Sequence, residues 1–291
     1  KVTSNGSFSA SASQYIIPFE QRLEGQDLQQ LLYGTSSAKS FTVSFHIKST
    51  KTGTYVLQAR HSSTAGQERT QAQSYTIDSA NTWEKKTITF SGDTNDDIAN
   101  NNAGHFSLFW WMIAGSTFTS GTLATSWEDN TNANRAVGVA SSSADDDSWQ
   151  ITGVQMEVGS VATEFEHRSF AEELGTCQRY FIRYPSLSDA STTMFYALGM
   201  IHSASVVYYN VNLPVPMRTQ PDLSISGADD FQSVDSGTIR NLTNLTLLGD
   251  AFIDNKVVTL QGAGTYPNED RPSVLRGDGT AGGHFALDAE I

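Results

Sequence analysis

The sequence predicts an all-β protein, in which an antiparallel β-sandwich is joined by a short helix to a second, smaller β-domain. From residue 41 onward, short runs of alternating apolar and polar residues recur between clusters of Gly, Ser, Asn and Asp. The 291 residues exceed the size of one ordinary core, so two domains are expected. A clear helical period occurs near residue 170, where it separates the two series of strands.

The strands of the first domain follow one another at short intervals. The alternation is clearest over residues 41–49, which place Phe41, Val43, Phe45 and Ile47 on one face. Residues 23–32 are expected to form a short helix or a loop before this strand. Further strands are predicted at residues 54–60, 73–77, 83–90, 105–113, 135–141 and 149–158. Many short strands with turn residues between them are typical of an antiparallel sandwich.

Residues 149–181 predict how the sandwich ends and the helix begins. The last strand stops at Gly159, and Ser169 with Glu172 then forms a capping box at a helix start. Four residues fall at i, i+4, i+7 and i+11 and share one helical face: Phe170, Leu174, Cys177 and Phe181. This face needs a covering surface, so we expect it to pack between the domains or between copies of the chain.

The domain boundaries follow from this junction. We expect a sandwich over residues 1–168, a connecting helix over 169–182 and a β-domain over 183–291. The last domain again shows strand patterns, within residues 201–227, 238–249, 251–262 and 284–291. Its Pro214, Pro216 and Pro221 cannot donate to a strand ladder, which suits a sheet edge or a strand entrance.

Charge and composition exclude several classes of partner. The chain has 18 basic and 31 acidic residues, a net charge of −13, and the acidic excess is similar in both halves. Without a basic face, binding to nucleic acid is not expected. No apolar run approaches the roughly 20 residues that span a bilayer, so membrane insertion is not expected. Cys177 is the single cysteine and is interpreted as a small packed residue.

The junction also carries a resemblance. Residues 153–181 read GVQMEVGSVATEFEHRSFAEELGTCQRYF. They resemble a junction in bacteriophage tail-fibre and related tail proteins, where a jelly roll ends and a helix begins. The strand order over residues 40–160 resembles carbohydrate-binding jelly rolls of the galactose-binding-like type. This resemblance implies a homotrimeric tail-fibre protein of the virion, which attaches to the host through surface glycans and contacts other tail proteins.

Candidate glycan contacts follow from aromatic and polar residue types. Sugars stack on flat aromatic rings, and neighbouring amides and carboxylates bind their hydroxyl groups. Trp127 lies in a polar loop, where it either contacts a glycan or closes one end of the sandwich. Trp110 and Trp111 must face opposite sides of their strand, so one lies in the core and the other lies against a ligand or a subunit. Trp83 and Trp149 are expected in the core. The glycan-binding candidates are Trp127, Glu128, Asp129, Asn130, Asn132 and Trp111.

Catalytic and metal-binding patterns are weak. No histidine pair has metal-ligand spacing, and no nucleophile or phosphate-loop motif occurs, so no catalytic residue is assigned and an enzyme is not expected. Two converging carboxylates of a glycosidase stay an alternative. The acidic groups at residues 93–97 and 145–147 are interpreted as solvated turns, with a structural calcium site as the alternative and no metal or cofactor assigned.

The predicted function is therefore host attachment by a phage tail fibre or receptor-binding protein. One alternative is a structural tail or baseplate component that contacts virion proteins alone. Another is a glycan-degrading tail enzyme. A carbohydrate-binding module from a bacterial enzyme would explain the sandwich but leaves the helix and the second domain unexplained.

Overall fold

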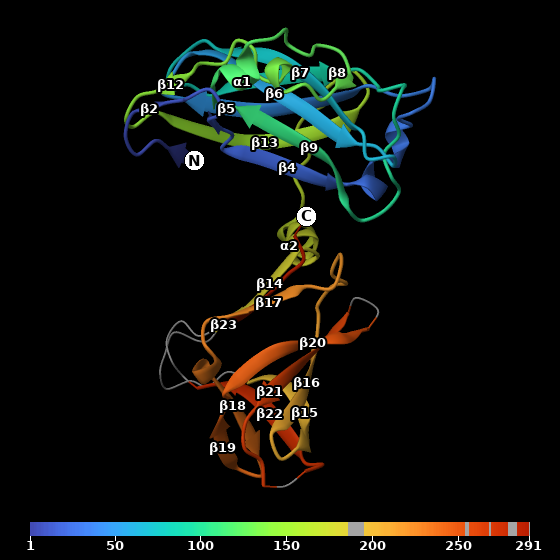
Figure 1. The fold of residues 1–291 in the computed structure, drawn as a ribbon, viewed down its shortest axis with the longest axis vertical. Helices are drawn as coiled ribbons and strands as arrows, with labels where there is room; N and C mark the ends of the chain where they lie inside the picture. The colour runs from blue at the N-terminus through green and yellow to red at the C-terminus, as the bar shows by residue number, and fades with distance from the viewer. Residues whose placement is uncertain (186–194, 254–255, 268, 279–283, 291) are drawn as a thin grey trace. The chain divides into compact units, whose positions relative to one another are not determined.

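The computed structural model describes residues 1–185, 195–253, 256–267, 269–278 and 284–290. The chain divides into two compact units: unit 1 comprises residues 1–167 and unit 2 comprises residues 168–290. Both are built from antiparallel strands (Figure 1), which confirms the predicted all-β class. No helix among the described residues is long and apolar enough to cross a membrane.

Unit 1 is a sandwich of two antiparallel sheets. The four-stranded sheet has the order β1 (Val2–Thr3), β13 (Ser148–Val158), β5 (Phe41–Ser49) and β8 (Glu84–Phe90). The five-stranded sheet has the order β11 (Glu128–Asp129), β7 (Glu68–Ile77), β6 (Gly53–Ser62), β9 (Gly104–Trp111) and β4 (Phe19–Glu24). Short pairs join β10 (Ile113–Ala114) to β3 (Tyr15–Ile16) and β12 (Ser142–Ser143) to β2 (Phe8–Ser9). The helical turns are η1 (Gly25–Leu31), α1 (Ser116–Thr119) and η2 (Asn132–Asn134).

The core of unit 1 lies between these two sheets. The alternating residues of β5 predicted to share one face are all buried there, and Phe41 stacks on Phe90 of β8 with ring centroids 4.8 Å apart. Trp110 and Trp149 are also core residues, whereas Trp83, which was expected in the core, is exposed immediately before β8. Burial of large aromatic side chains from both sheets is the main force that holds the sandwich closed.

A second apolar layer covers the outer face of the five-stranded sheet. Residues 115–141 cross this face, and Phe118, Ala136 and Val139 pack there on strand residues. The strand predicted at residues 135–141 is wrong: Arg135 is in the αR conformation after η2, and Gly138 has a φ of +94°. These apolar residues therefore mark a covering loop, whose alternating pattern resembles that of a strand.

The junction follows the predicted order. β13 ends at Val158, and Gly159 reverses the chain with a φ of +107°. Residues after the turn run back beside β13, because Thr163 donates to Glu157 and the Glu166 amide donates to Gln155 over 2.8 Å.

The connecting helix α2 (Phe170–Gln178) belongs to unit 2 and starts with the predicted capping box. The Glu172 amide donates to Ser169 Oγ, and the Ser169 amide donates to Glu172 over 3.0 Å. The helix is shorter than the predicted 169–182, because Arg179 caps it and Phe181 lies in strand β14. All four residues of the predicted apolar face are exposed, Phe170 most of all at 82%.

Unit 2 is a smaller sandwich. Its three-stranded sheet has the order β14 (Phe181–Pro185), β23 (His284–Asp288) and β17 (Asp222–Ile225). Its seven-stranded sheet has the order β19 (Thr238–Asn241), β18 (Phe231–Asp235), β22 (Pro272–Gly277), β15 (Phe195–Ser203), β16 (Val206–Asn212), β21 (Val257–Ala263) and β20 (Asn244–Ile253). A short helical turn, η3 (Ala228–Asp230), precedes β18. Ile182, Phe285 and Leu287 from the small sheet share a core with Ile201 and Leu260 from the large one. Pro221 immediately precedes β17, as expected of a strand entrance.

Candidate functional site

The predicted glycan loop is divided between the two faces of the five-stranded sheet. Strand β11 pairs with β7, with Glu128 opposite Thr70 and Asp129 opposite Arg69. Successive strand residues face opposite sides. Trp127 and Asp129 therefore contact the core side of the sheet, whereas Glu128 lies on its outer side. The six predicted residues do not form one site.

On the core side, Trp127 closes one end of the sandwich, which is the alternative role expected for it. Its indole Nε1 donates to the Ser91 carbonyl over 2.6 Å, and its ring meets those of Tyr33 and His61 edge to face. Trp127 is half buried and packs against the unit 1 core. Its ring is thus occupied by protein contacts.

A buried charged cluster lies beneath this tryptophan, and sequence reasoning missed it. The Asp93 carboxylate accepts from His61 Nε2 and from Arg69 Nε, each over 3.0 Å. Arg69 Nη1 also donates to Asp129 over 2.7 Å. Burial opposes ionisation of Asp93, but the hydrogen bonds from His61 and Arg69 outweigh it and lower the pKa of Asp93 to about 2. The cluster links the loop of Asp93 to strand β7 and to edge strand β11, so Asp129 has a structural role.

On the outer side, the polar candidates bind one another and their strand neighbours. Asn130 Nδ2 donates to Glu68 Oε2 over 2.8 Å, and Glu68 also pairs with Arg60 at 3.5 Å. Glu128 Oε1 accepts from Asn134 over 2.7 Å. Asn132 Oδ1 accepts from Arg135 Nη1 over 3.3 Å. Amide, carboxylate and guanidinium groups thus gather over the sheet.

Trp111 lies underneath Arg135, and its burial corrects the prediction that it contacts a ligand or another subunit. Its side chain is fully buried, because residues 115–141 cover it, and its Nε1 donates to Gln58 over 2.8 Å. The Arg135 guanidinium lies over its ring at 5.0 Å, near Phe109 and Phe118. Trp111 therefore supports the surface instead of forming it.

The exposed ring of this surface is Tyr15, which the sequence analysis did not select. Tyr15 is 51% exposed, and its ring lies 5.4 Å from Trp111. Arg135 contacts the same tryptophan, and Arg60 lies 5.0 Å over the adjacent Phe109. No local pattern marks Tyr15, because β3 reaches this face through its pairing with β10. We define the outer-sheet site as Tyr15, Arg60, Glu68, Asn132 and Arg135.

Electrostatics single out Arg135 within the outer-sheet site. Among the described residues it forms no ion pair with a carboxylate. Burial, followed by the nearby Arg60 charge, lowers the pKa of Arg135 to about 10. An anionic group bound here would offset both effects, so the site is suited to an acidic or hydroxyl-rich ligand.

The acidic turns are occupied by protein donors. Asp97 accepts from the backbone and hydroxyl of Thr64, and Asp147 accepts from the Ala144 amide over 2.7 Å. In the described part of the chain, no group of three His, Cys, Asp or Glu residues is arranged to hold a metal ion. We therefore assign no calcium ion to these acidic turns.

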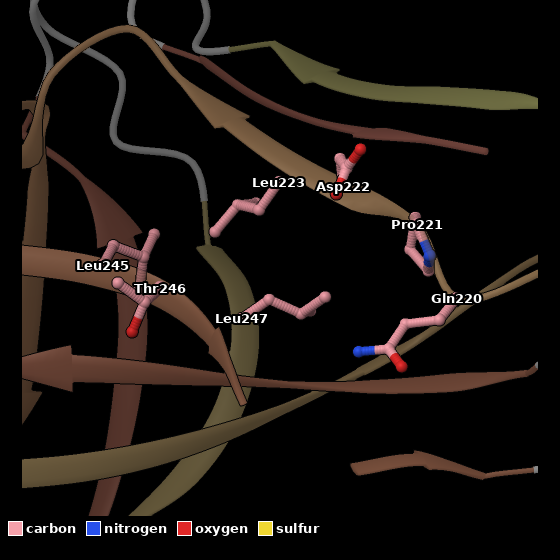
Figure 2. Close-up of a pocket in the computed structure, with 7 residues that line it drawn as sticks. All are labelled: Gln220, Pro221, Asp222, Leu223, Leu245, Thr246 and Leu247. Atoms are coloured by element: carbon pink, nitrogen blue, oxygen red, sulfur yellow. The ribbon is translucent and has the colours of Figure 1, made fainter. Parts of the chain in front are cut away.

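Two shallow grooves lie elsewhere. One, of about 480 Å³, lies on unit 2 between residues 220–223 and 245–247; Figure 2 shows Leu223 and Leu247 extending into it. Another, of about 530 Å³, lies on unit 1 between residues 50–52 and the turn at 142–147. The groove on unit 2 has no aromatic residue. In the groove on unit 1, Lys51 already donates to the Ser142 carbonyl. Neither groove therefore offers the exposed ring and the charged donors of the outer-sheet site.

Comparison with protein-family models, curated proteins and solved structures finds no match.

Proposed function

We propose that this chain is a receptor-binding protein of the phage tail-fibre class, located in the virion, that attaches to host cells by binding surface glycans. The observation that carries the proposal is the outer-sheet site, where the exposed Tyr15 ring and the Arg135 guanidinium both lie against Trp111. The resemblance of residues 153–181 to tail-protein junctions supports the same class of protein.

The groups of the outer-sheet site match the chemistry of a sugar. A tyrosine ring stacks on the C–H face of a pyranose, and amide and carboxylate oxygens accept from its hydroxyl groups. Arg135 supplies a planar pair of donors that favours a carboxylate or phosphate substituent. We therefore propose that acidic glycans bind better than neutral ones.

Attachment would gain strength from several copies. One such site is small and exposed, so its affinity alone is weak. A homotrimer presents three sites to one surface and raises the apparent affinity through effective concentration. We propose this trimer as the assembled form, with other tail proteins as further partners.

The test is binding of the purified chain to host cells, extracted lipopolysaccharide and an array of acidic and neutral glycans. We expect binding to acidic glycans and an at least tenfold loss in the Tyr15→Ser variant, while Tyr15→Phe retains most of it. Trp83→Ser is the matched control, because Trp83 is an exposed aromatic residue of unit 1 outside the site.

Other outcomes identify the rival functions. If wild-type protein binds none of these glycans or cells, the proposal is wrong and a structural tail component is favoured. Release of reducing ends from host polysaccharide would identify a glycan-degrading enzyme instead.

A further inference from the structure

Part of one face of the seven-stranded sheet of unit 2 is apolar and exposed. Along β15, Ile201 points into the core, whereas its neighbours Met200 and Leu198 lie on the opposite side and are 57% and 74% exposed. Strands β18 and β22 alternate in the same way, with buried residues on the core side. The outward positions of a solvated sheet are usually polar, so this face departs from the expected pattern.

The strand register makes the exposed apolar residues contiguous. Ile239 lies opposite Val234, Val234 opposite Val274, and Val274 opposite Leu198, so one row crosses four neighbouring strands. Directly opposed side chains in antiparallel strands have Cβ atoms about 5 Å apart. We define the unit 2 sheet face by these residues and two further exposed ones: Ile239, Val234, Val274, Leu198, Met200 and Phe195.

Polar residues border this apolar row. Tyr208 lies opposite Met200, and Asn210 lies opposite Leu198. On the other side, Arg276 donates twice to Gln232 Oε1, over 2.9 and 2.6 Å. An apolar centre with a polar rim that includes the charged Arg276 is the composition of a protein–protein interface.

Charge indicates which partner fits. Residues 169–291 contain 7 basic and 14 acidic residues, a net charge of −7. None of the outward-facing residues of strands β19, β18, β22, β15, β16 and β21 is Asp or Glu. Two copies of an acidic protein repel each other across most surfaces, so they approach best where acidic groups are absent. A basic partner would be attracted to the acidic surfaces instead, and an anionic membrane would repel this unit.

We propose that the unit 2 sheet face binds a second copy of this chain, and that this contact brings the chains of the assembly together. The inference goes beyond the proposed function, because it assigns the contact to a surface and requires no glycan. It also distinguishes the sheet face from the exposed residues of α2, which lie on a different element of unit 2.

The test is the mass of the full chain in solution, measured by light scattering and sedimentation equilibrium. We expect wild-type protein at a multiple of 31.6 kDa and the Leu198→Asp variant at 31.6 kDa. Leu198 is 74% exposed, so the substitution is compatible with the fold, which circular dichroism and thermal unfolding will verify. Met200→Asp is the second variant and is expected to behave in the same way.

Val161→Asp is the matched control, because it places the same charge on an exposed apolar residue of unit 1, outside the sheet face and helix α2, and should leave the oligomer intact. A monomeric wild-type protein, or variants Leu198→Asp and Met200→Asp that keep the wild-type mass, would overturn the inference. Glycan binding is measured separately. Wild-type protein that forms the oligomer but binds no glycan would contradict the proposed function and would leave the inference about the sheet face unaffected.

Discussion

At the scale of single residues, Asp93 makes the most consequential contacts of unit 1. Its carboxylate is almost fully buried and accepts from both His61 and Arg69. Paired buried charges are weakly stabilising as a set, but removal of one partner is costly because the other charge stays buried without compensation. Asp93 therefore holds the end of the sandwich on which Trp127 packs.

The lowered pKa of Asp93 predicts a loss of stability in acid. An unfolded aspartate has a pKa near 3.9, and the folded value is about 2. The folded state thus binds fewer protons between these values, so the stabilisation is complete above pH ~4 and is lost as the pH falls toward 2. We expect this carboxylate to contribute about 3 kcal/mol to the acid-induced decrease, measured by urea unfolding at several pH values.

The Asp93→Asn variant tests the same residue at neutral pH. It removes the anion that His61 and Arg69 Nε share, while Arg69 keeps Asp96 and Asp129 as partners, so we expect the free energy of unfolding of unit 1 to fall by about 3 kcal/mol. The pH dependence between 4 and 2 should shrink at the same time. Asp78→Asn is the control, since Asp78 is exposed and meets Lys86 at 3.7 Å. Equal effects of both substitutions would contradict the assigned role of the buried cluster.

At the scale of elements, alternation decides what each side chain can do. Edge strand β11 sends Glu128 to the outer side and Asp129 to Arg69 on the core side. The four polar candidates of this loop, Glu128, Asp129, Asn130 and Asn132, thereby acquire different roles. In unit 2, the same alternation on β15 turns Ile201 into the core and leaves Leu198 and Met200 exposed.

The start of helix α2 tests whether a capping box can hold a helix that lacks buried residues. The helix contains no buried residue, so its start depends strongly on the capping box of Ser169 and Glu172. We expect Ser169→Ala to cost about 1 kcal/mol of helix stability and to speed amide exchange in the first turn. Hydrogen-exchange mass spectrometry measures this, with Ser160→Ala as a control outside the helix. Unchanged exchange would show that other contacts hold the helix start.

At the scale of the whole molecule, two cores are separate. The residues that pack between the sheets of unit 1 and those that fill unit 2 belong to different clusters, and the division falls between His167 and Arg168. Each unit buries its own large aromatic residues, such as Trp110 in unit 1 and Phe285 in unit 2. Each therefore has the means to fold by itself.

This organisation predicts independent unfolding. We expect fragments 1–167 and 168–290 each to show cooperative thermal transitions, and Asp93→Asn in the full chain to lower the unit 1 transition alone. Differential scanning calorimetry of the chain and both fragments provides the measurement. An unfolded fragment, or a shift of both transitions, would show that the units stabilise each other.

The sequence by itself determined the features that depend on neighbouring residues. Period-two alternation predicted β5 with its buried face, and the Ser169–Glu172 spacing predicted the start of α2, because backbone hydrogen bonding and side-chain direction are local properties. The all-β class followed from the repetition of such strands.

Tertiary structure alone decided which residues meet. Trp111 has the pattern of an outward strand residue, yet a loop that crosses the sheet buries it and leaves Tyr15 exposed. Asp93 meets Arg69 and His61 from distant parts of the chain, and the register of β15 against β22 assembles the unit 2 sheet face. Such contacts depend on strand order and register, which arise from packing over the whole fold and leave no local periodic signal.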